Sequence, residues 1–218
     1  MDTGIPLTPA ASKIVCFGRT FAKHAVELGN EIPREPVFFL KAPSAMIADG
    51  AAIQLPAASQ EVHYEAEAAI VIGQKIKAVS PEAAYAAIQG WTVLNDVTAR
   101  DIQRADKGRF TRAKGFDTFC PIASVFVPQL DWAKTYVQCL VNSEQRQYAP
   151  LSELLLTPAE LVSHASHYMT LMPGDIVSLG TPAGVGPLKN GDVVTAQLVS
   201  DSGNILVGVS NPVLGYID

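Results

Sequence analysis

The sequence predicts an α+β fold that is predominantly β, and it argues against a doubly wound parallel sheet. Short runs of apolar or alternating residues recur along the chain, as expected of β-strands. Helical patterns are few, and the 15 prolines and 16 glycines are spread throughout. This spacing indicates many short elements joined by turns.

The first elements follow an N-terminal arm, residues 1–12, and open a single domain that we expect to span residues 13–218. Two apolar runs predict strands. A segment between them has helical character, with glycine just after its end, where helices commonly stop. The predicted elements are a strand at Lys13–Phe17, a helix at Thr20–Leu28 closed by Gly29, and a strand at Val37–Leu40.

The segment His63–Gly73 is the most informative stretch, because an acidic pair interrupts an apolar strand pattern. One face of the strand would carry Glu65, Glu67, Ala69 and Val71. The opposite face would carry Ala66, Ala68, Ile70 and Ile72. Given the rise of a strand, the two same-face glutamates would lie about 7 Å apart at their Cα atoms.

Caps, turns and alternation predict the remaining elements. Ser80 followed by Pro81 indicates the start of a helix, and Gly90 indicates its end. A capping-box pattern over Thr157–Glu160 starts another helix, which we expect to run to about Met172. The expected strands are Trp91–Asp96, Thr135–Val141 with its hairpin partner Gln145–Tyr148, Ile176–Leu179, Val193–Leu198 and Ile205–Val209.

Composition argues against several classes of protein. The 218 residues carry a net charge of −5 with a pI of about 5.3, which disfavours a nucleic-acid-binding surface. No apolar run approaches the roughly 18 residues of a membrane span, and the start lacks a secretory pattern. Cys16, Cys120 and Cys139 are widely spaced and are expected to be buried free thiols. We therefore expect a cytoplasmic protein that binds neither nucleic acid nor membrane.

Glu65 and Glu67 are candidates for holding a cation. Neighbouring carboxylates on an otherwise apolar strand repel each other and resist burial, and a bound cation relieves both costs. Their oxygen atoms suit Mg²⁺ or Mn²⁺. The alternative interpretation is that both glutamates face water on an amphipathic strand.

Asp96 ends the next predicted strand and allows two interpretations. An acid at this place either faces a crevice or acts as the N-cap of a helix over Thr98–Ala105. On that helix Arg100 and Gln103 stand three residues apart and share one side. Arg100 could then bind a carboxylate through two hydrogen bonds, and Gln103 could bind a carbonyl.

Six segments in a fixed order, lying between about Lys13 and Val209, carry a family resemblance. They are GRTFAKH at 18–24, PVFFLK at 36–41, HYEAE at 63–67, DVTARD at 96–101, KGFD at 114–117 and GTPAGVGP at 180–187. Together they resemble the fumarylacetoacetate hydrolase family, in particular its short, single-domain, acylpyruvase-like branch. One departure is Thr20-Phe21, where this branch often has Asn-Tyr, and it affects contacts expected at the distal end of the substrate.

The resemblance implies a fold, an assembly and a metal site. The fold would be a mixed β-sandwich roll of the type formed by the family's C-terminal domain, and the assembly would be a homodimer. Glu65, Glu67 and Asp96 would hold Mg²⁺ or Mn²⁺. The single domain over 13–218 would accordingly be catalytic.

The resemblance also assigns roles to other side chains. A lid helix would carry His24 as general base, with Glu27 three residues on to orient it. Lys114 would bind substrate and donate to developing negative charge, and Thr181 would contact the substrate carboxylate. By residue type alone, His24 and Lys114 would be surface side chains, and the loop around Thr181 would be an ordinary turn.

The reaction implied by the resemblance is metal-dependent hydrolysis of a C–C bond in a 2,4-dioxo acid. An acylpyruvate or fumarylpyruvate would yield pyruvate and a carboxylic acid. The same metal-stabilised enolate also serves decarboxylation of oxaloacetate or a related 2-oxo diacid, and isomerisation or tautomerisation. The His24–Glu27 pair favours hydrolysis, because hydrolysis requires an activated water. A non-catalytic, metal-dependent binding protein is the alternative from another class.

Overall fold

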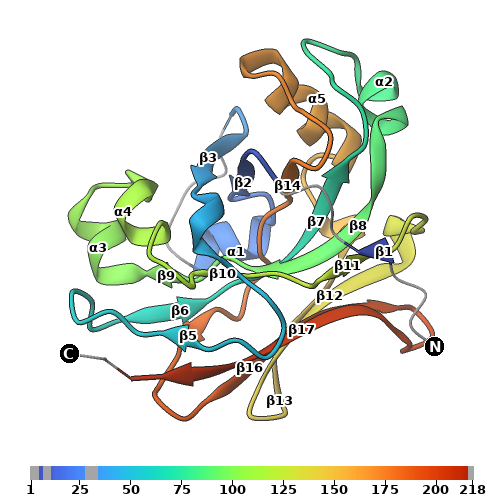
Figure 1. Cartoon of the computed structure of the whole chain (residues 1–218). Helices are drawn as coiled ribbons and strands as arrows, with labels where there is room; N and C mark the ends of the chain where they lie inside the picture. Colours follow the sequence, from blue (N-terminus) through green and yellow to red (C-terminus); the bar gives the residue numbers. More distant parts are fainter. Residues whose placement is uncertain (1–4, 7–10, 28–33, 216–218) are drawn as a thin grey trace.

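The computed structural model in Figure 1 describes residues 5–6, 11–27 and 34–215. Within these ranges the chain forms two five-stranded sheets, one three-stranded sheet and two two-stranded sheets, together with five short α-helices. Parallel and antiparallel neighbours occur in the same sheet. The prediction of a mixed, predominantly β, α+β fold is confirmed.

The first five-stranded sheet carries most of the predicted N-terminal strands. Its parallel pair is β2 with β14, and its other neighbouring strands are antiparallel. In spatial order its strands are β3 (Val37–Lys41), β2 (Ile14–Gly18), β14 (Ile176–Ser178), β7 (Ala66–Ile72) and β8 (Ile88–Asn95).

The second five-stranded sheet contains the predicted hairpin. Asn142 and Ser143 form the turn with positive φ angles of 52° and 67°, as a tight hairpin requires. In spatial order its strands are β13 (Glu144–Pro150), β12 (Thr135–Val141), β16 (Val193–Ser200), β17 (Ile205–Leu214) and β5 (Ile53–Gln54).

Short strands complete the sheets. Ile5 and Pro6, within the expected N-terminal arm, pair with Phe126 and Val125, whereas residues 1–4 and 7–10 of that arm lie outside the described ranges. The three-stranded sheet is β15 (Gly186–Pro187), β6 (Val62–Tyr64) and β9 (Thr98–Ala99); the two-stranded sheets are β1 (Ile5–Pro6) with β11 (Val125–Phe126) and β10 (Cys120–Pro121) with β4 (Met46–Ile47).

Four of the five described α-helices lie in two pairs. Figure 1 places α2 beside α5 at one end of the molecule, and α3 beside α4 at another. Their bounds are α1 (Ala22–Glu27), α2 (Pro81–Ala86), α3 (Arg100–Ala105), α4 (Phe110–Lys114) and α5 (Pro158–Tyr168). Ser80 and the Thr157–Glu160 capping box begin α2 and α5 as predicted.

Strand β7 is buried along its whole length because both of its faces are covered. Ala66, Ala68, Ile70 and Ile72 belong to the main core, which also includes side chains from β12 and β16 of the second sheet. Ala69 and Val71 belong to a second core on the opposite face. The predicted alternation is therefore confirmed over residues 66–72, with Glu67 on the face of Ala69 and Val71, whereas the single predicted strand is broken at Glu65.

Two predicted helix ends are wrong. Helix α2 stops at Ala86, and Gly90 lies inside β8, where an added Cβ would come within 2.2 Å of the Phe126 ring. The glycine therefore permits close packing and does not end the helix. Helix α5 ends at Tyr168 instead of near Met172, and the expected end of the first helix at Gly29 lies outside the described residues.

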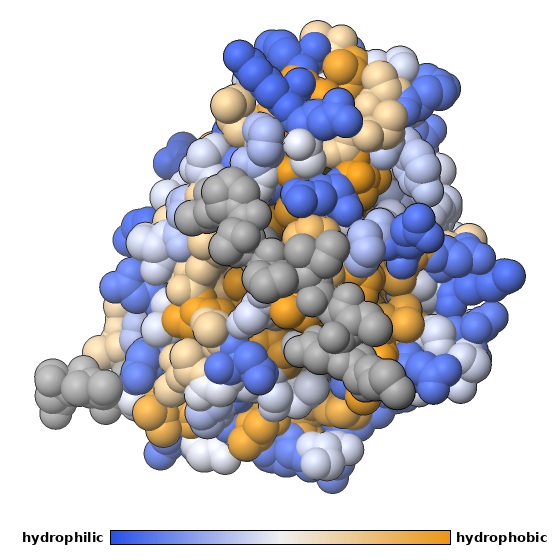
Figure 2. Space-filling view, turned by 45° about the vertical axis from the view of Figure 1, so that its right-hand side comes forward, coloured by the Kyte–Doolittle hydropathy of each residue, from blue (hydrophilic) through white to orange (hydrophobic). Residues whose placement is uncertain are grey.

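The cysteines, the helices and the surface were also subjects of prediction. All three cysteines are buried free thiols, as predicted. Among the helices that the structure describes, none is both long and apolar enough to cross a lipid bilayer. Polar and apolar residues are interspersed over the described part of the face in Figure 2. Large exposed apolar side chains also come from separate elements, for example Val26, Leu40, Tyr85 and Ile205.

Candidate active site

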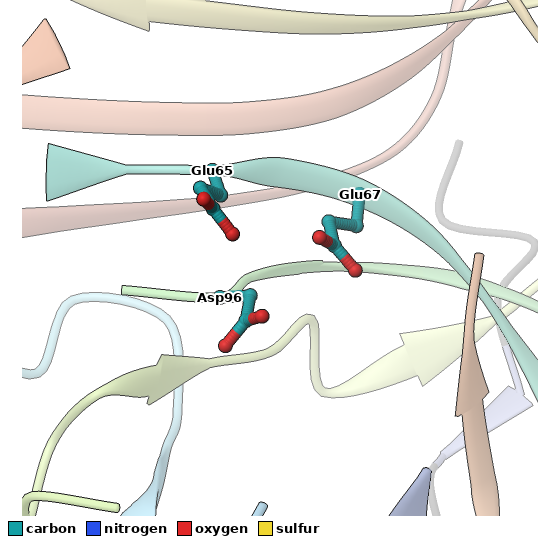
Figure 3. A group of neighbouring side chains, drawn as sticks. All are labelled: Glu65, Glu67 and Asp96. Carbon is teal, nitrogen blue, oxygen red and sulfur yellow. The ribbon is translucent and has the colours of Figure 1, made fainter. Parts of the chain in front are cut away.

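Three carboxylates converge where β6, β7 and β8 meet. Glu65 lies in the one-residue break between β6 and β7, Glu67 is the second residue of β7, and Asp96 directly follows β8. The backbone N–H of Asp96 donates to the carbonyl of Glu65 at 2.8 Å and fixes this junction. One oxygen from each carboxylate lies within 4.8 Å of the others. Figure 3 shows Glu65, from the break between the strands, and Glu67, from β7, extending toward Asp96.

Burial decides between the alternative interpretations of these acids. Glu65, Glu67 and Asp96 are 4%, 1% and 1% exposed, so the interpretation of water-facing glutamates is wrong. Asp96 is not a helix cap either, because α3 begins at Arg100 with Ala99 in the N-cap position. A cluster of three buried carboxylates is electrostatically unfavourable unless positive charge lies close by.

Lys114 supplies part of that positive charge. The side chain comes from the end of α4 and is almost completely buried, so the interpretation of a solvated surface lysine is wrong. Its Nζ donates to Glu65 Oε2 at 2.7 Å, to Asp96 Oδ2 at 2.5 Å and to Thr98 Oγ1 at 2.8 Å. These three contacts use all three N–H groups of the ammonium.

Two further cations flank the carboxylates. Lys41, at the end of β3, has a fully buried side chain whose Nζ donates to Asp96 Oδ1 at 2.6 Å and to the carbonyl of Val97 at 3.2 Å. Arg100 pairs with Glu65 through Nη2 and donates from Nη1 to Gln103 Oε1 at 2.8 Å. Its Nε has no hydrogen-bond partner among the described residues.

The ionisation of these groups follows from their neighbours. Burial opposes the charge of Glu65, but Arg100 and Lys114 outweigh it and hold the pKa of this carboxyl below its ordinary range. Burial likewise opposes the charge of Lys114, while Asp96 and Glu65 outweigh it and raise the lysine pKa. For Glu67, burial and the charges of Asp96 and Glu65 all act together and raise the pKa.

Glu67 is the carboxylate with the greatest need of a cation. Among the described residues no lysine or arginine forms an ion pair with Glu67, and both of its hydrogen bonds go to Oε2. The donors are Ser178 Oγ at 2.5 Å and the backbone N–H of Gly180 at 3.2 Å. A divalent cation would balance this buried charge, and an all-carboxylate set suits Mg²⁺ or Mn²⁺. The residues present therefore fit such an ion.

The predicted lid residues lie together on α1. His24 is 6% exposed, so the interpretation of a surface histidine is wrong. Its Nδ1 lies 3.1 Å from Glu27 Oε2, and the other carboxylate oxygen of Glu27 accepts from the backbone N–H of Gly184 at 2.9 Å. Glu27 thus connects His24 to the glycine-rich loop.

The glycine-rich loop is held by a side chain from the second sheet. Thr181 Oγ1 donates to the carbonyl of Ala66 at 2.9 Å and accepts from Gln147 Nε2 at 2.8 Å. Gln147, which is buried, also donates to Pro182 and accepts from the N–H of Ala66 at 3.0 Å. Because the proton of the Thr181 hydroxyl is already donated, the backbone N–H of Thr181 is the donor left for a ligand.

A single cavity of about 430 Å³ connects these groups. It is lined by all of the predicted site residues apart from Glu27, which reaches it only through His24. Aromatic side chains of Phe17, Phe39 and Phe110 complete its wall. A cavity of this volume with few, convergent polar groups is typical of a small-molecule site.

Sequence reasoning did not assign several residues that contact the site residues, among them Lys41, Gln147 and Ser178. Lys41 follows an apolar run, and a lone lysine there has no pattern that separates it from a solvated strand end. Gln147 could have been found from the hairpin register, which places it opposite the buried Cys139. Ser178 pairs with Ala69 across the sheet, a long-range neighbour that no local pattern indicates.

Comparison with known proteins agrees with this geometry. The family model for the C-terminal domain of fumarylacetoacetate hydrolase matches residues 13–212. The chain belongs to the fumarylacetoacetate hydrolase family. The resemblance drawn from the six sequence segments is therefore confirmed, and so is the fold expected from it.

Relatives within the fumarylacetoacetate hydrolase family include enzymes of more than one reaction type. The chain is 42% identical to a mitochondrial oxaloacetate tautomerase of Arabidopsis thaliana, over 86% of each chain. It is 40% identical to a mitochondrial oxaloacetate decarboxylase of Dictyostelium discoideum, over 84% of this chain and 86% of the relative. It is also similar to a fumarylpyruvate hydrolase from Pseudomonas aeruginosa, solved with Mn²⁺ and pyruvate. That match has 30% identity and a TM-score of 0.85, over 94% of this chain and 91% of the other.

Proposed function

We propose that this protein is a divalent-metal-dependent hydrolase that cleaves a C–C bond in a small 2,4-dioxo acid, of the acylpyruvate or fumarylpyruvate type. The products would be pyruvate and a carboxylic acid. The observation that carries the proposal is that His24, paired with Glu27, lines the same cavity as the three carboxylates. Glu65, Glu67 and Asp96 would hold Mg²⁺ or Mn²⁺, and residues 13–218 would form one catalytic domain.

The bound cation would supply Lewis-acid stabilisation of the negative charge on a pyruvate enolate. The protein's own residues must then activate water. Because Nδ1 of His24 faces Glu27, Nε2 is the ring nitrogen available to accept a proton from the water that attacks C4. Glu27 would stabilise the imidazolium formed. When the C3–C4 bond breaks, C3 takes a proton and pyruvate leaves.

Three residues are suited to orient the acid end of the substrate. Arg100 retains an unpartnered Nε, and Gln103 retains its amide N–H groups while its oxygen accepts from Arg100. Thr181 offers its backbone N–H. Lys114 would bring positive charge to the developing enolate, provided that it exchanges one of its three present contacts for the substrate.

A second candidate is enolisation or decarboxylation of oxaloacetate. The two relatives at 42% and 40% identity, an oxaloacetate tautomerase and an oxaloacetate decarboxylase, favour it. Both reactions use an enolate at the same carbon and need no attacking water, so His24 would then transfer a proton at C3. A non-catalytic binding role would lack any such proton transfer.

The deciding experiment is turnover of acetylpyruvate, fumarylpyruvate and oxaloacetate, compared side by side with Mg²⁺ or Mn²⁺. For a hydrolase, we expect pyruvate and acid from an acylpyruvate, with His24→Gln and Glu65→Ala lowering kcat by at least about 100-fold. Oxaloacetate turnover alone would exclude the hydrolase in favour of the second candidate. Turnover of none of the three acids, with no deuterium exchange at C3 of oxaloacetate above the uncatalysed rate, would exclude both.

We also propose that the protein is a homodimer that takes a small 2-oxo acid as its ligand. Among the described residues, strand β3 forms an edge of the first sheet, and Leu40 on it is half exposed, so this strand offers an apolar side chain for contact with a second copy. Sedimentation at micromolar concentration tests the assembly, and a purely monomeric species would contradict it.

A further inference from the structure

Gln147 is a polar side chain in a buried, apolar position. It lies on β13 opposite Cys139, which belongs to the main core, and it is only 1% exposed. The register shifts just before it, so that Gln145 pairs with Leu140 and Arg146 is the extra residue of a β-bulge. Bulges next to active sites commonly redirect a side chain. A glutamine in this position costs desolvation energy unless its amide is hydrogen-bonded.

The hydrogen bonds of Gln147 join the second sheet to two separate parts of the site. Its Oε1 accepts from the backbone N–H of Ala66 at 3.0 Å. Its Nε2 donates to Thr181 Oγ1 and to the carbonyl of Pro182, both at 2.8 Å. Ala66 stands between the two glutamates in the sequence. One buried amide therefore contacts both the strand that carries the candidate metal ligands and the glycine-rich loop.

These bonds lie where the main-chain pairing of β14 with β7 ends. The N–H of Leu179, just beyond β14, still donates to the carbonyl of Ala68 at 2.9 Å. In the two-residue step of an antiparallel ladder, the backbone of Thr181 would be the next to pair with Ala66. Gly180 turns the chain away instead, with a positive φ of 93°. The backbone groups of Ala66 that face this side therefore need other partners.

Two side chains satisfy Ala66 in place of that pairing. Thr181 Oγ1 donates to the carbonyl of Ala66 at 2.9 Å, and Gln147 accepts from its N–H. Because Gln147 also donates to Thr181 Oγ1, it directs the hydroxyl proton toward Ala66. The backbone N–H of Thr181 is left without a hydrogen-bond partner among the described residues, at a position that lines the cavity. Gln147 thus fixes a free donor relative to the ligand strand.

The glycine-rich loop is supported from two directions. On one side Gly184, with a positive φ of 102°, packs so closely on β13 that an added Cβ would overlap the carbonyl of Arg146. On the other side the N–H of Gly184 donates to Glu27 of α1, whose side chain is 33% exposed. Hydrogen bonds in a buried, low-dielectric place are stronger than those in contact with water. The amide of Gln147 is therefore the firmer of the two polar supports.

We infer that Gln147 is a positioning residue that holds the backbone N–H of Thr181 beside the candidate metal ligands, where this N–H binds the carboxylate of a 2-oxo acid. Gln147 acts through Thr181 and Ala66, since it does not itself line the cavity. The inference rests on the proposed function for the place of the substrate carboxylate. It applies to both candidate reactions, because both begin with a bound 2-oxo acid.

The test measures two affinities without turnover. Titration followed by electron paramagnetic resonance gives the Kd of Mn²⁺, and relaxation of the pyruvate methyl protons by protein-bound Mn²⁺ gives the Kd of pyruvate. In Gln147→Met, which fills a similar volume without an amide, we expect the pyruvate Kd to rise about 10- to 100-fold, as for a misplaced hydrogen bond to a charged group. The Mn²⁺ Kd should change far less, because Gln147 contacts none of the three carboxylates and the bonds of Ser178 and Gly180 to Glu67 remain.

Variants of Thr181 test whether Gln147 acts through it. Thr181→Val, which lacks the hydroxyl, should weaken pyruvate binding, whereas Thr181→Ser, which keeps it, should not. In the Thr181→Val background, Gln147→Met should cause a smaller further loss than in the wild type, because the two residues share one path. Gln197→Met is the matched control. It removes another buried glutamine of the same sheet, whose amide donates to Gln138, and it should leave both affinities unchanged.

Unchanged pyruvate affinity in Gln147→Met would overturn the inference while leaving the proposed function intact. An equal loss of Mn²⁺ and pyruvate affinity would also overturn it, because Gln147 would then only support the fold. If Gln147→Met does not fold, Gln147→Asn decides by the same two criteria, since its amide is one methylene shorter and cannot span the same partners. A wild type that binds no pyruvate in the presence of Mn²⁺ and turns over none of the three acids would remove the proposed function, and the inference with it.

Discussion

Replacing Lys41 by methionine removes a positive charge from a place that solvent does not reach. Methionine fills a similar volume, so the main loss is electrostatic. The Nζ of Lys41 donates at 2.6 Å to Asp96 Oδ1, and the side chains of the pair are 0% and 1% exposed. Breaking a buried ion pair by removing one partner costs about 3–5 kcal/mol. Because Lys114 still binds the other oxygen of Asp96, we expect about 3 kcal/mol.

For a chain of this size, each kcal/mol lowers the Tm by about 2–4 °C, so Lys41→Met should melt about 6–12 °C below the wild type. Urea unfolding in the presence of a chelator gives the free energy directly. Lys23→Met is the matched control, because its pair with Glu153 is exposed and contributes less than about 1 kcal/mol. If the Lys41 variant lost no more stability than the Lys23 variant, the argument that Asp96 needs a buried counter-charge would be refuted.

Three further predictions concern the packing of the core, the loss of stability at low pH and the binding of the metal. Gly90→Ala should cost about 2 kcal/mol or more in urea unfolding, since its Cβ would lie 2.2 Å from an aromatic carbon, whereas Gly18→Ala, with nothing within 4 Å, should be nearly neutral. Asp175 is buried, which raises its pKa, but hydrogen bonds from Lys13 and its neighbours outweigh burial and lower it. The stability that Asp175 contributes is therefore present above a pH of about 4 and is lost as the pH falls through the lowered pKa of the folded state. In Asp175→Asn the midpoint of urea unfolding should change less with pH over that range. Glu67→Gln should abolish the rise in Tm that Mn²⁺ produces in scanning calorimetry, and an unchanged rise would remove Glu67 from the ligand set.

The strand pattern around the carboxylates could be predicted because it depends on local alternation. In β7 every second residue enters the same core, so a period of two in the sequence is sufficient to assign both faces. The acidic pair could also be recognised as a candidate metal site, since two glutamates in an otherwise apolar strand pattern require a counter-charge if they are buried. The convergence of Asp96 with them depends on the pairing of β7 and β8, which the sequence pattern did not specify.

The incorrect predictions share a physical cause, which is that long-range packing overrides local preference. Gly90 indicates a helix end by local rules, yet its role is to admit the Phe126 ring from a distant segment. Lys41 and Gln147 have ordinary local contexts, and only the folded chain turns them toward Asp96 and Thr181. His24 was assigned through family resemblance, because its burial depends on packing that the local sequence does not encode.

The burial of β7 on both faces has a consequence for how this protein could acquire a new substrate. A slip of one residue would send Glu67 into the main core and a core side chain into the cavity, so the ligand strand has no freedom to adjust. The turn at Arg19 and the segment from Arg104 to Phe110 line the same cavity without contributing a carboxylate. A library built for altered selectivity should therefore vary these two wall segments and leave residues 65–72 untouched.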